Sequence, residues 1–224
     1  PDNTININFR GISGQSFGGY LINGINLNLE GEANDYVGKS MHGGEVAIYP
    51  DKETKFLSDG NSIIGNTVLY GATGGKLFAS GLAGERFCVR NSGATAVVEG
   101  TGDHACEYMT GGEVYILGPI GKNFGAGMSG GIAYIFNENK DISLNVNQDM
   151  VFIDELSEND KIKIKNIINE HLAKTGSVKA KAILEDFDNK VSNFVRIIPK
   201  EIYKILESKG ISIDDFNFIK PDIN

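Results

Sequence analysis

The sequence predicts a mainly β protein. Residues 1–150 are expected to form a parallel β-helix, and residues 151–224 an α-rich C-terminal extension. Two observations carry this prediction. Of the 29 glycines, 27 lie at or before Gly131, and this glycine-rich part contains a repeat. From about Ser157 the apolar residues change to the spacing of about 3.6 residues that is typical of an α-helix. This change in composition and period marks the boundary between the two parts.

The repeat is marked by glycines that precede short apolar runs. The anchor glycines Gly75, Gly93, Gly112 and Gly131 are 18, 19 and 19 residues apart, and Gly44 precedes a similar run. Residues two and four positions beyond each anchor are mostly apolar, and this period of two predicts strands with one buried face. The expected internal columns are Val46, Leu77, Thr95, Val114 and Ala133, and Ile48, Ala79, Val97, Ile116 and Ile135. The opposite face carries Glu45, Lys76 and Glu113.

A repeat of this length favours a parallel β-helix over other repeat folds. The leucine pattern of leucine-rich repeats is missing, and a propeller blade needs about 40 residues. In a β-helix the coils stack about 4.8 Å apart, and the corners need glycine where φ is positive. The longer interval from Gly44 to Gly75 predicts an insertion at Pro50–Gly60, which has the polarity of a surface excursion.

The two cysteines offer a check on this stacking. Cys88 lies 13 residues after Gly75, and Cys106 lies 13 residues after Gly93. They are therefore expected to be vertical neighbours on adjacent coils. Two cysteines are too few for a disulfide scaffold, so we expect two reduced thiols in a cytoplasmic protein.

The C-terminal part predicts three helices and an extended segment. The first helix, Glu158–Lys174, is marked by Ile162, Ile164, Ile167, Ile168 and Leu172 and ends at Thr175-Gly176. Ser177 is expected to cap a second helix, Val178–Lys190, with Ala180, Ile183, Leu184 and Phe187 on its inner face. Phe194–Pro199 is extended, Lys200–Lys209 is helical up to Gly210, and Ile211–Asn224 is a partly ordered tail. Some of this extension is expected to cover an end of the β-helix.

Charge and hydropathy exclude two classes of partner. The 21 basic and 29 acidic residues give a net charge of −8. Nucleic-acid binders and proteins drawn to anionic membranes need clustered basic residues, so neither class is expected. No apolar stretch approaches the roughly 18 residues that a membrane-spanning helix requires.

Motifs for nucleotide or metal chemistry fail on context. Gly125–Gly130 matches the G-x-G-x-x-G pattern, but it precedes a strand where a dinucleotide site would need a helix. His42, His104 and His171 show no metal-ligand spacing. His104 lies near Asp103 and Cys106, so a Cys/His nucleophile pair is conceivable, although the equivalent residues of adjacent coils, Arg86 and Asn123, indicate a solvated polar column.

A β-helix that acts on polysaccharide is the competing enzyme hypothesis. It would need paired carboxylates on one outer face and aromatic platforms for sugar rings. The available carboxylates are Glu45, Glu85, Glu99, Asp103, Glu107 and Glu113, and the available tyrosines include Tyr49, Tyr115 and Tyr134. No paired column of carboxylates is evident, and we therefore predict no catalytic, cofactor-binding or metal-binding residues in this chain.

The sequence resembles the C-terminal GXGXG domain of the glutamate synthase large subunit. The resemblance covers Asn8–Phe136 and continues in the tail. The matching stretches are Asp35–Gly44, Asn66–Gly75, Gly81–Phe87, Val89–Ala94, Val97–Gly112, Thr175–Ser177, Ala182–Asp186, Phe194-Val195 and Ile198–Lys204. The resemblance implies a right-handed, single-stranded parallel β-helix.

The resemblance also implies a place in an enzyme. Glutamate synthases make two glutamates from glutamine and 2-oxoglutarate, with an amidotransferase part that releases ammonia and a synthase part that binds FMN and an iron–sulfur cluster. This sequence shows no iron–sulfur cysteine run and no phosphate-binding barrel loops. The resemblance therefore implies a non-catalytic structural module whose partners carry both cofactors and dock on flat coil walls. The related β-helix subunit of formylmethanofuran dehydrogenase is the family alternative.

Overall fold

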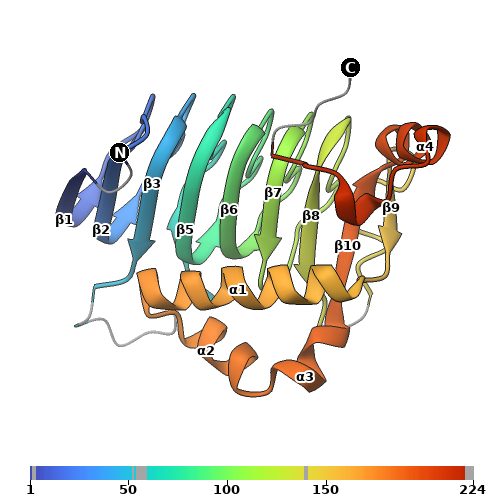
Figure 1. Ribbon diagram of the computed structural model, residues 1–224. Coiled ribbons are helices and arrows are strands. Elements are labelled where there is room, and N and C mark those ends of the chain that lie inside the picture. Colours follow the sequence, from blue (N-terminus) through green and yellow to red (C-terminus); the bar gives the residue numbers. More distant parts are fainter. Residues whose placement is uncertain (2–3, 52, 54–59, 139–140, 220–224) are drawn as a thin grey trace.

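The computed structural model describes residues 1, 4–51, 53, 60–138 and 141–219. It is a β-solenoid of about seven turns with helices along one side (Figure 1). The successive parallel strands are β1 (Ile5–Ser13), β2 (Ile25–Ala33), β3 (His42–Tyr49), β5 (Gly74–Ala83), β6 (Ser92–Thr101), β7 (Thr110–Ile116) and β8 (Gly130–Phe136). The predicted mainly β fold of stacked parallel coils is confirmed.

The third coil differs from the others at the expected insertion. The next strand after β3 is the short β4 (Ser62–Ile64), which pairs with both β2 and β5. Ala33 pairs with Ile64, and Ser62 pairs with Leu82. Most of the predicted excursion Pro50–Gly60 lies outside the described residues, namely 52 and 54–59.

At β6, the residues that face the interior lie one position later in the sequence than predicted. Leu77 pairs with Ala96, which pairs with Val114, and Ala79 pairs with Val98. The assignment of Thr95 and Val97 to the inner columns was therefore wrong. Between Ser92 and Thr95 the register shifts, because two residues of β6 lie opposite one residue of β7. Gly93 is thus not equivalent to the other anchors.

Each coil contains a corner segment in which left-handed residues alternate with others, and the stacked corner segments form what we call the corner wall. In every second position of this segment φ is positive, as at Arg86, Cys88 and Arg90 of one coil and at His104, Cys106 and Tyr108 of the next. The sequence analysis assigned such positions to glycine, but 13 described non-glycine residues adopt them. Backbone hydrogen bonds run from each coil to both neighbours and hold this conformation in place.

The expected stacking of the two cysteines is confirmed. Both occupy the middle left-handed position of their coils, and the Cys106 N–H donates to the carbonyl of Phe87, the residue before Cys88, at 2.7 Å. Both are free thiols that are fully buried. Burial raises the pKa of both thiols, so neither is poised as a nucleophile.

The helical extension matches the prediction with two corrections. The elements are α1 (Glu158–Thr175), α2 (Val178–Glu185), α3 (Phe187–Lys190), the short η2 (Val191–Asn193), β10 (Phe194–Pro199), α4 (Lys200–Lys209) and η3 (Ile213–Asp215). The second predicted helix was wrong as a single helix, because the extended φ of Asp186 interrupts it. Ile162 is 59% exposed and does not belong to the inner face of α1.

The extension makes a second core outside the solenoid. Helix α1 crosses the strands from β3 toward β10 (Figure 1). Its Ile164 and Ile168, with Ile183 of α2, cover Phe78 and Tyr134 on the outer face of the strands. A strand pair, rather than a helix, continues the sheet at the last coil: β10 runs antiparallel to both β8 and β9 (Val151–Asp154).

Membrane insertion through a helix finds no support in the described residues. None of their helices has both the length and the apolar character that a bilayer crossing requires.

Close stacking makes Gly112 a sensitive position. Gly112 has a φ of +94°, and a Cβ atom there would lie 2.4 Å from the carbonyl oxygen of Ala94 on the coil below. We expect Gly112→Ala to lower the free energy of unfolding by about 2–5 kcal/mol, from left-handed strain and overpacking together. Urea denaturation measures this difference.

Gly176→Ala is the matched control. Gly176 also has a positive φ, but no atom lies within 4 Å of the added Cβ position. Only the conformational penalty of about 1–2 kcal/mol then applies. Equal losses in the two variants would contradict the close-stacking explanation.

Candidate functional site

The outward column of charged residues pairs with helix α1. Lys76 Nζ lies 2.7 Å from Glu170, Glu113 lies 3.9 Å from Lys163, and Glu45 pairs with Lys174. The predicted outward orientation of Glu45, Lys76 and Glu113 is therefore confirmed. Such partly exposed ion pairs contribute only about 0–1 kcal/mol each to the free energy of unfolding. Their main effect is therefore to fix the register of α1 along the strands.

A buried polar cluster lies where α1 ends against the solenoid. Glu99 of β6 accepts hydrogen bonds from Ser80 at 2.9 Å and from Ser177, which also caps α2. His171 of α1 lies 3.7 Å from the same carboxylate and stacks on Phe78. Glu99 and His171 are both fully buried. The sequence analysis weighed Glu99 only as a surface residue, and that interpretation was wrong.

The environment of Glu99 favours its charged form. Burial by itself raises the pKa of this carboxyl, but the nearby ring of His171, first of all, and the hydrogen bonds from Ser177 and Ser80 act in the opposite direction. The net pKa of Glu99 is lowered. Since the cluster joins two strands to α1 and α2, its contacts fasten the helices to the solenoid.

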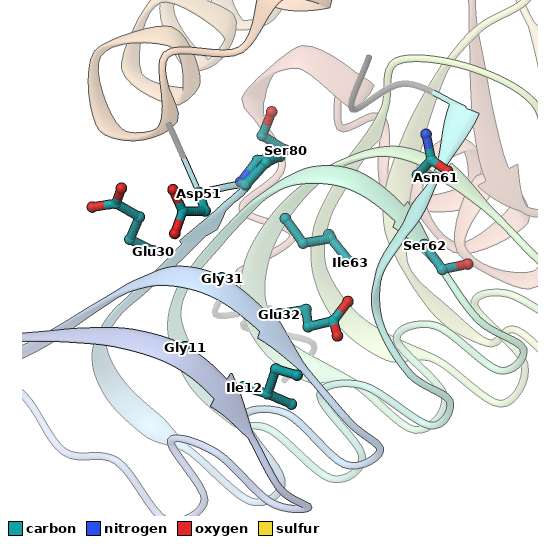
Figure 2. A pocket seen from close by; sticks show the side chains of 11 residues that line it. Gly11, Ile12, Glu30, Gly31, Glu32, Asp51, Asn61, Ser62, Ile63 and Ser80 are labelled. Atoms are coloured by element: carbon teal, nitrogen blue, oxygen red, sulfur yellow. The ribbon is translucent and has the colours of Figure 1, made fainter. Parts of the chain in front are cut away.

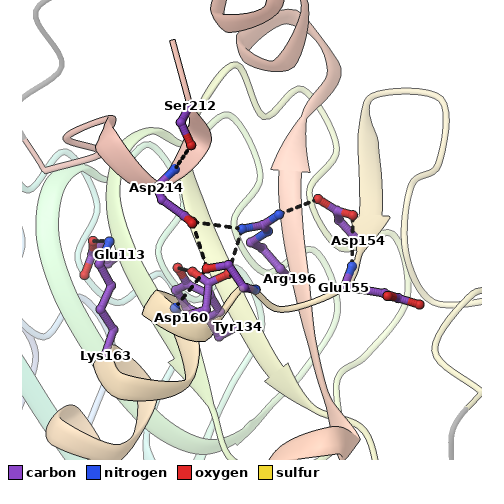
Figure 3. A network of polar contacts seen from close by, with 10 residues as sticks. Glu113, Tyr134, Asp154, Glu155, Asp160, Lys163, Arg196, Ser212 and Asp214 are labelled. Carbon is purple, nitrogen blue, oxygen red and sulfur yellow. Dashed lines mark hydrogen bonds and ion pairs between the residues drawn. The ribbon is translucent and has the colours of Figure 1, made fainter.

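A second polar network is centred on Arg196 of β10 (Figure 3). Its guanidinium donates to Asp160 of α1 and to Asp154 of β9, each at 2.7 Å. It also lies 3.6 Å from Asp214 of η3. Tyr134 of β8 donates to Asp160 at 2.6 Å. One buried guanidinium thus joins the strand pair at the last coil to α1 and to the tail.

The charge of Arg196 is held by these carboxylates. Burial alone lowers the pKa of the guanidinium, but its hydrogen bond to Asp154 and the charges of Asp160 and Asp154 outweigh it, and the pKa is raised. Asp160 also completes a capping box with Ser157 at the start of α1. Asp160 therefore both caps the N-terminus of α1 and forms the buried ion pair with Arg196.

The Cys/His nucleophile pair that the sequence made conceivable is not assembled. The ring of His104 contacts the amide of Asn123 at 3.1 Å, and Asp103 accepts from the backbone N–H of Lys122. Cys106 faces the apolar core. His42 is exposed and lies on another coil. In the described part of the chain, no three His, Cys, Asp or Glu side chains lie close enough to hold a metal ion.

Several residues that the polysaccharide hypothesis would use are buried or paired with other side chains. Glu85 is exposed, and Glu107 pairs with Arg86 on the corner wall. Tyr115 and Tyr134 are buried beneath α1, with their rings stacked 5.0 Å apart. They cannot serve as sugar platforms, and their proposed role there was wrong. Tyr49 is only partly exposed.

A pocket of about 260 Å³ lies where the insertion leaves the solenoid. Figure 2 shows Glu30 and Asp51 at one end and Ser62 at the other. Asp51 is bound by the guanidinium of Arg10 at 3.0 Å. The pKa of Asp51 is lowered, first by the backbone N–H of Glu53 and then by Arg10. A carboxyl whose charged form is favoured in this way is poorly suited to act as a general acid.

The lowered pKa of Glu99 makes stability depend on pH. The stabilisation is present above the ordinary glutamate value of 4.5 and is lost as the pH falls through the lower folded-state pKa. Glu99→Gln is therefore expected to be less stable than the unchanged chain by about 1–3 kcal/mol at neutral pH, with a smaller gap in acid. Urea unfolding at pH 7 and below pH 4.5 checks this. Glu85→Gln, at an exposed site, is the control and should change little; a gap independent of pH would contradict the assignment.

Arg196→Met removes the cation from the second network. It leaves Asp160 buried without its partner, and we expect a loss of about 3–5 kcal/mol in the free energy of unfolding. Lys181→Met is the control, because Lys181 pairs with Glu185 on the exposed face of α2 and should cost at most about 1 kcal/mol. Similar losses in both variants would show that Arg196 does not hold the last coil to the helices.

Comparisons with known proteins agree with this arrangement. The model of the family described as "GXGXG motif" matches residues 1–200. The chain is 50% identical over 211 residues to glutamate synthase [NADH] of Schizosaccharomyces pombe, which covers 94% of this chain and 10% of the relative. It is 48% identical to ferredoxin-dependent glutamate synthase 2 of Synechocystis and 47% identical to the glutamate synthase [NADPH] large chain of Bacillus subtilis, each over 210 residues, 93% of this chain and 14% of the relative.

The chain therefore spans only about a tenth to a seventh of the length of these relatives. In them the matching part is a small C-terminal domain of the large subunit. Sequence pattern, solenoid fold and relatives together show that this chain belongs to the GXGXG-motif family, the domain family of the glutamate synthase large subunits.

Proposed function

We propose that this chain is a non-catalytic structural domain or subunit of glutamate synthase, which holds the amidotransferase and synthase parts of the enzyme in position. The relatives support a domain of glutamate synthase. Its role within that enzyme is our inference from the structure.

The observation that carries the proposal is the use made of the buried ionisable groups. Glu99 and His171 fasten α1 to the strands, and Arg196 with Asp160 fastens α1 to the last coil. Catalytic acids and bases normally face a cleft that admits substrate. Here these groups face one another inside the protein, which is the arrangement expected of a scaffold.

The solenoid suits a spacing role on mechanical grounds. Each coil is hydrogen-bonded to the coils next to it, both along the strands and along the corner wall. Helix α1 lies across several coils and couples them further. A rod of this kind keeps a fixed distance between the parts attached to it.

The cofactors of the reaction belong on the partner domains in this proposal. Both cysteines of this chain face the apolar core, so their thiols do not offer ligands for an iron–sulfur cluster. In the part of the solenoid that the structure describes, the corners between β1 and β8 contain no helix whose N-terminus could receive the FMN phosphate. We place the domain in the cytoplasm, with the amidotransferase and FMN-binding synthase as its partners.

A chimera tests the proposal. In the Bacillus subtilis large chain, the matching segment is replaced by this chain, and glutamate formation from glutamine and 2-oxoglutarate is measured. We expect the chimera to be active and a deletion of the segment to abolish the coupled reaction, because the two catalytic parts lose their common support.

The isolated chain provides the complementary measurement. It is assayed for glutaminase, glutamate synthase and uronate-lyase activity, and its visible absorption spectrum is recorded. We expect no turnover and no flavin absorption. Turnover by the chain alone, or full coupled activity of the deletion variant, would overturn the structural role.

A further inference from the structure

The two ends of the solenoid differ. At one end, β10 and β9 extend the sheet beyond β8 and the tail packs nearby. At the other end, β1 is exposed along nearly its whole length (Figure 1). Ile5, Ile7 and Phe9 are 48%, 39% and 42% exposed, and among the described residues no element lies beyond β1 in the sheet.

These exposed side chains belong to the internal columns. Ile5, Ile7 and Phe9 pair in register with Ile25, Leu27 and Leu29 of β2, of which both leucines are buried. Phe9 also packs edge-on against Phe17 at 5.3 Å. The apolar residues of β1 are therefore core residues that lack a further coil above them. Covering them would contribute roughly 25 cal/mol for each Å² removed from water.

The outer edge of β1 has few of the features that normally prevent an edge strand from pairing with another strand. An edge strand presents unpaired N–H and C=O groups, and natural edges are usually blunted by proline, lysine or short length. β1 has nine residues with neither proline nor lysine. Its single charged side chain, Arg10, is turned toward Asp51. The edge has the length and regularity of a site that accepts another strand.

The relatives indicate what covers this end. In them the GXGXG domain is a small C-terminal domain, so most of the large subunit precedes it. Pro1 lies close to the first two coils, because Thr4, just before β1, donates to the Pro1 carbonyl, and Gly24, just before β2, lies beside the same carbonyl.

We propose that the open end of the solenoid docks an extended segment of the glutamate synthase polypeptide that precedes this domain in its relatives. The segment adds a strand to the free edge of β1 and places apolar side chains on Ile5, Ile7 and Phe9. This inference rests on the proposed function and assigns the end of the solenoid, rather than a flat wall, as a contact with the enzyme.

The side-chain ladder of β1 indicates the chemistry of that segment. Asn28 Nδ2 donates to Asn8 Oδ1 at 2.9 Å, so the amide nitrogen of Asn8 is directed away from β2. A docked strand with a side-chain oxygen opposite Asn8 accepts a hydrogen bond from the Asn8 amide nitrogen and so continues the ladder of asparagine side chains. The docked segment is thus expected to alternate apolar side chains over the core with polar oxygen-bearing side chains over Asn8.

Two matched isoleucines test the docking. Ile7 of β1 is 39% exposed and Ile153 of β9 is 36% exposed, so they probe the first and last strands of the same sheet. Ile7→Cys and Ile153→Cys are each made in this chain and in the Bacillus subtilis chimera, and thiol labelling of each site is followed by peptide mass spectrometry. The buried Cys88 and Cys106 give an unreactive internal reference.

We expect Ile7→Cys to label at least about tenfold more slowly in the chimera than in the isolated chain, because labelling then requires local opening. Ile153→Cys should label at similar rates in both. Circular dichroism of each isolated variant confirms that the solenoid is folded.

The outcomes separate this inference from the proposed function. An active chimera whose Ile7→Cys site labels as fast as in the isolated chain would overturn the docking and leave the structural role intact. An assembled but inactive chimera would count against the structural role. Protection of Ile7→Cys in a self-associated isolated chain, detected by sedimentation, would assign the edge to a second copy and overturn the docking.

Discussion

Backbone hydrogen bonding between successive coils is the constraint on which the rest of this structure depends. Each coil donates to and accepts from its neighbours, both along the strands and along the corner wall. On the corner wall this pairing requires left-handed residues at alternate positions, and residues such as Arg86 and Tyr108 adopt them although side chains disfavour that conformation. The bonds formed with two neighbouring coils offset this strain, because the alternative is unpaired backbone at a buried interface.

The stacked coils create two surfaces that must be covered, and the chain covers one of them itself. The outer face of the strand wall carries aromatic residues such as Tyr115 and Tyr134, which lie under α1. Buried polar contacts then hold the helix at both ends: His171 lies near Glu99 at one end, and Asp160 forms an ion pair with Arg196 at the other. Buried ion pairs are weak sources of stability, but they disfavour other placements of the helix because a displaced charge would be left without a partner.

The second surface is the open end at β1, which is the contact with the rest of the enzyme in the docking that we propose. A solenoid can grow or be joined at its ends without altering its interior, since each coil contacts only its neighbours. The same property explains how one domain can occupy about a tenth of a much larger relative and still retain its own core. In the role that we propose, the surfaces of the domain hold the other parts of the enzyme, and its buried polar groups stabilise the fold.

The sequence by itself determined the class of fold, the repeat and most of the helix boundaries. Period-two patterns and glycine anchors are local signals, and so are the cap residues Ser157 and Gly176, which bound α1 as expected. Only the tertiary structure decided the register of β6, the left-handed corner wall and the burial of Glu99 and Tyr134. Each of these depends on a neighbouring coil or on a helix distant in sequence, and a single chain pattern does not reveal which face such an element will cover.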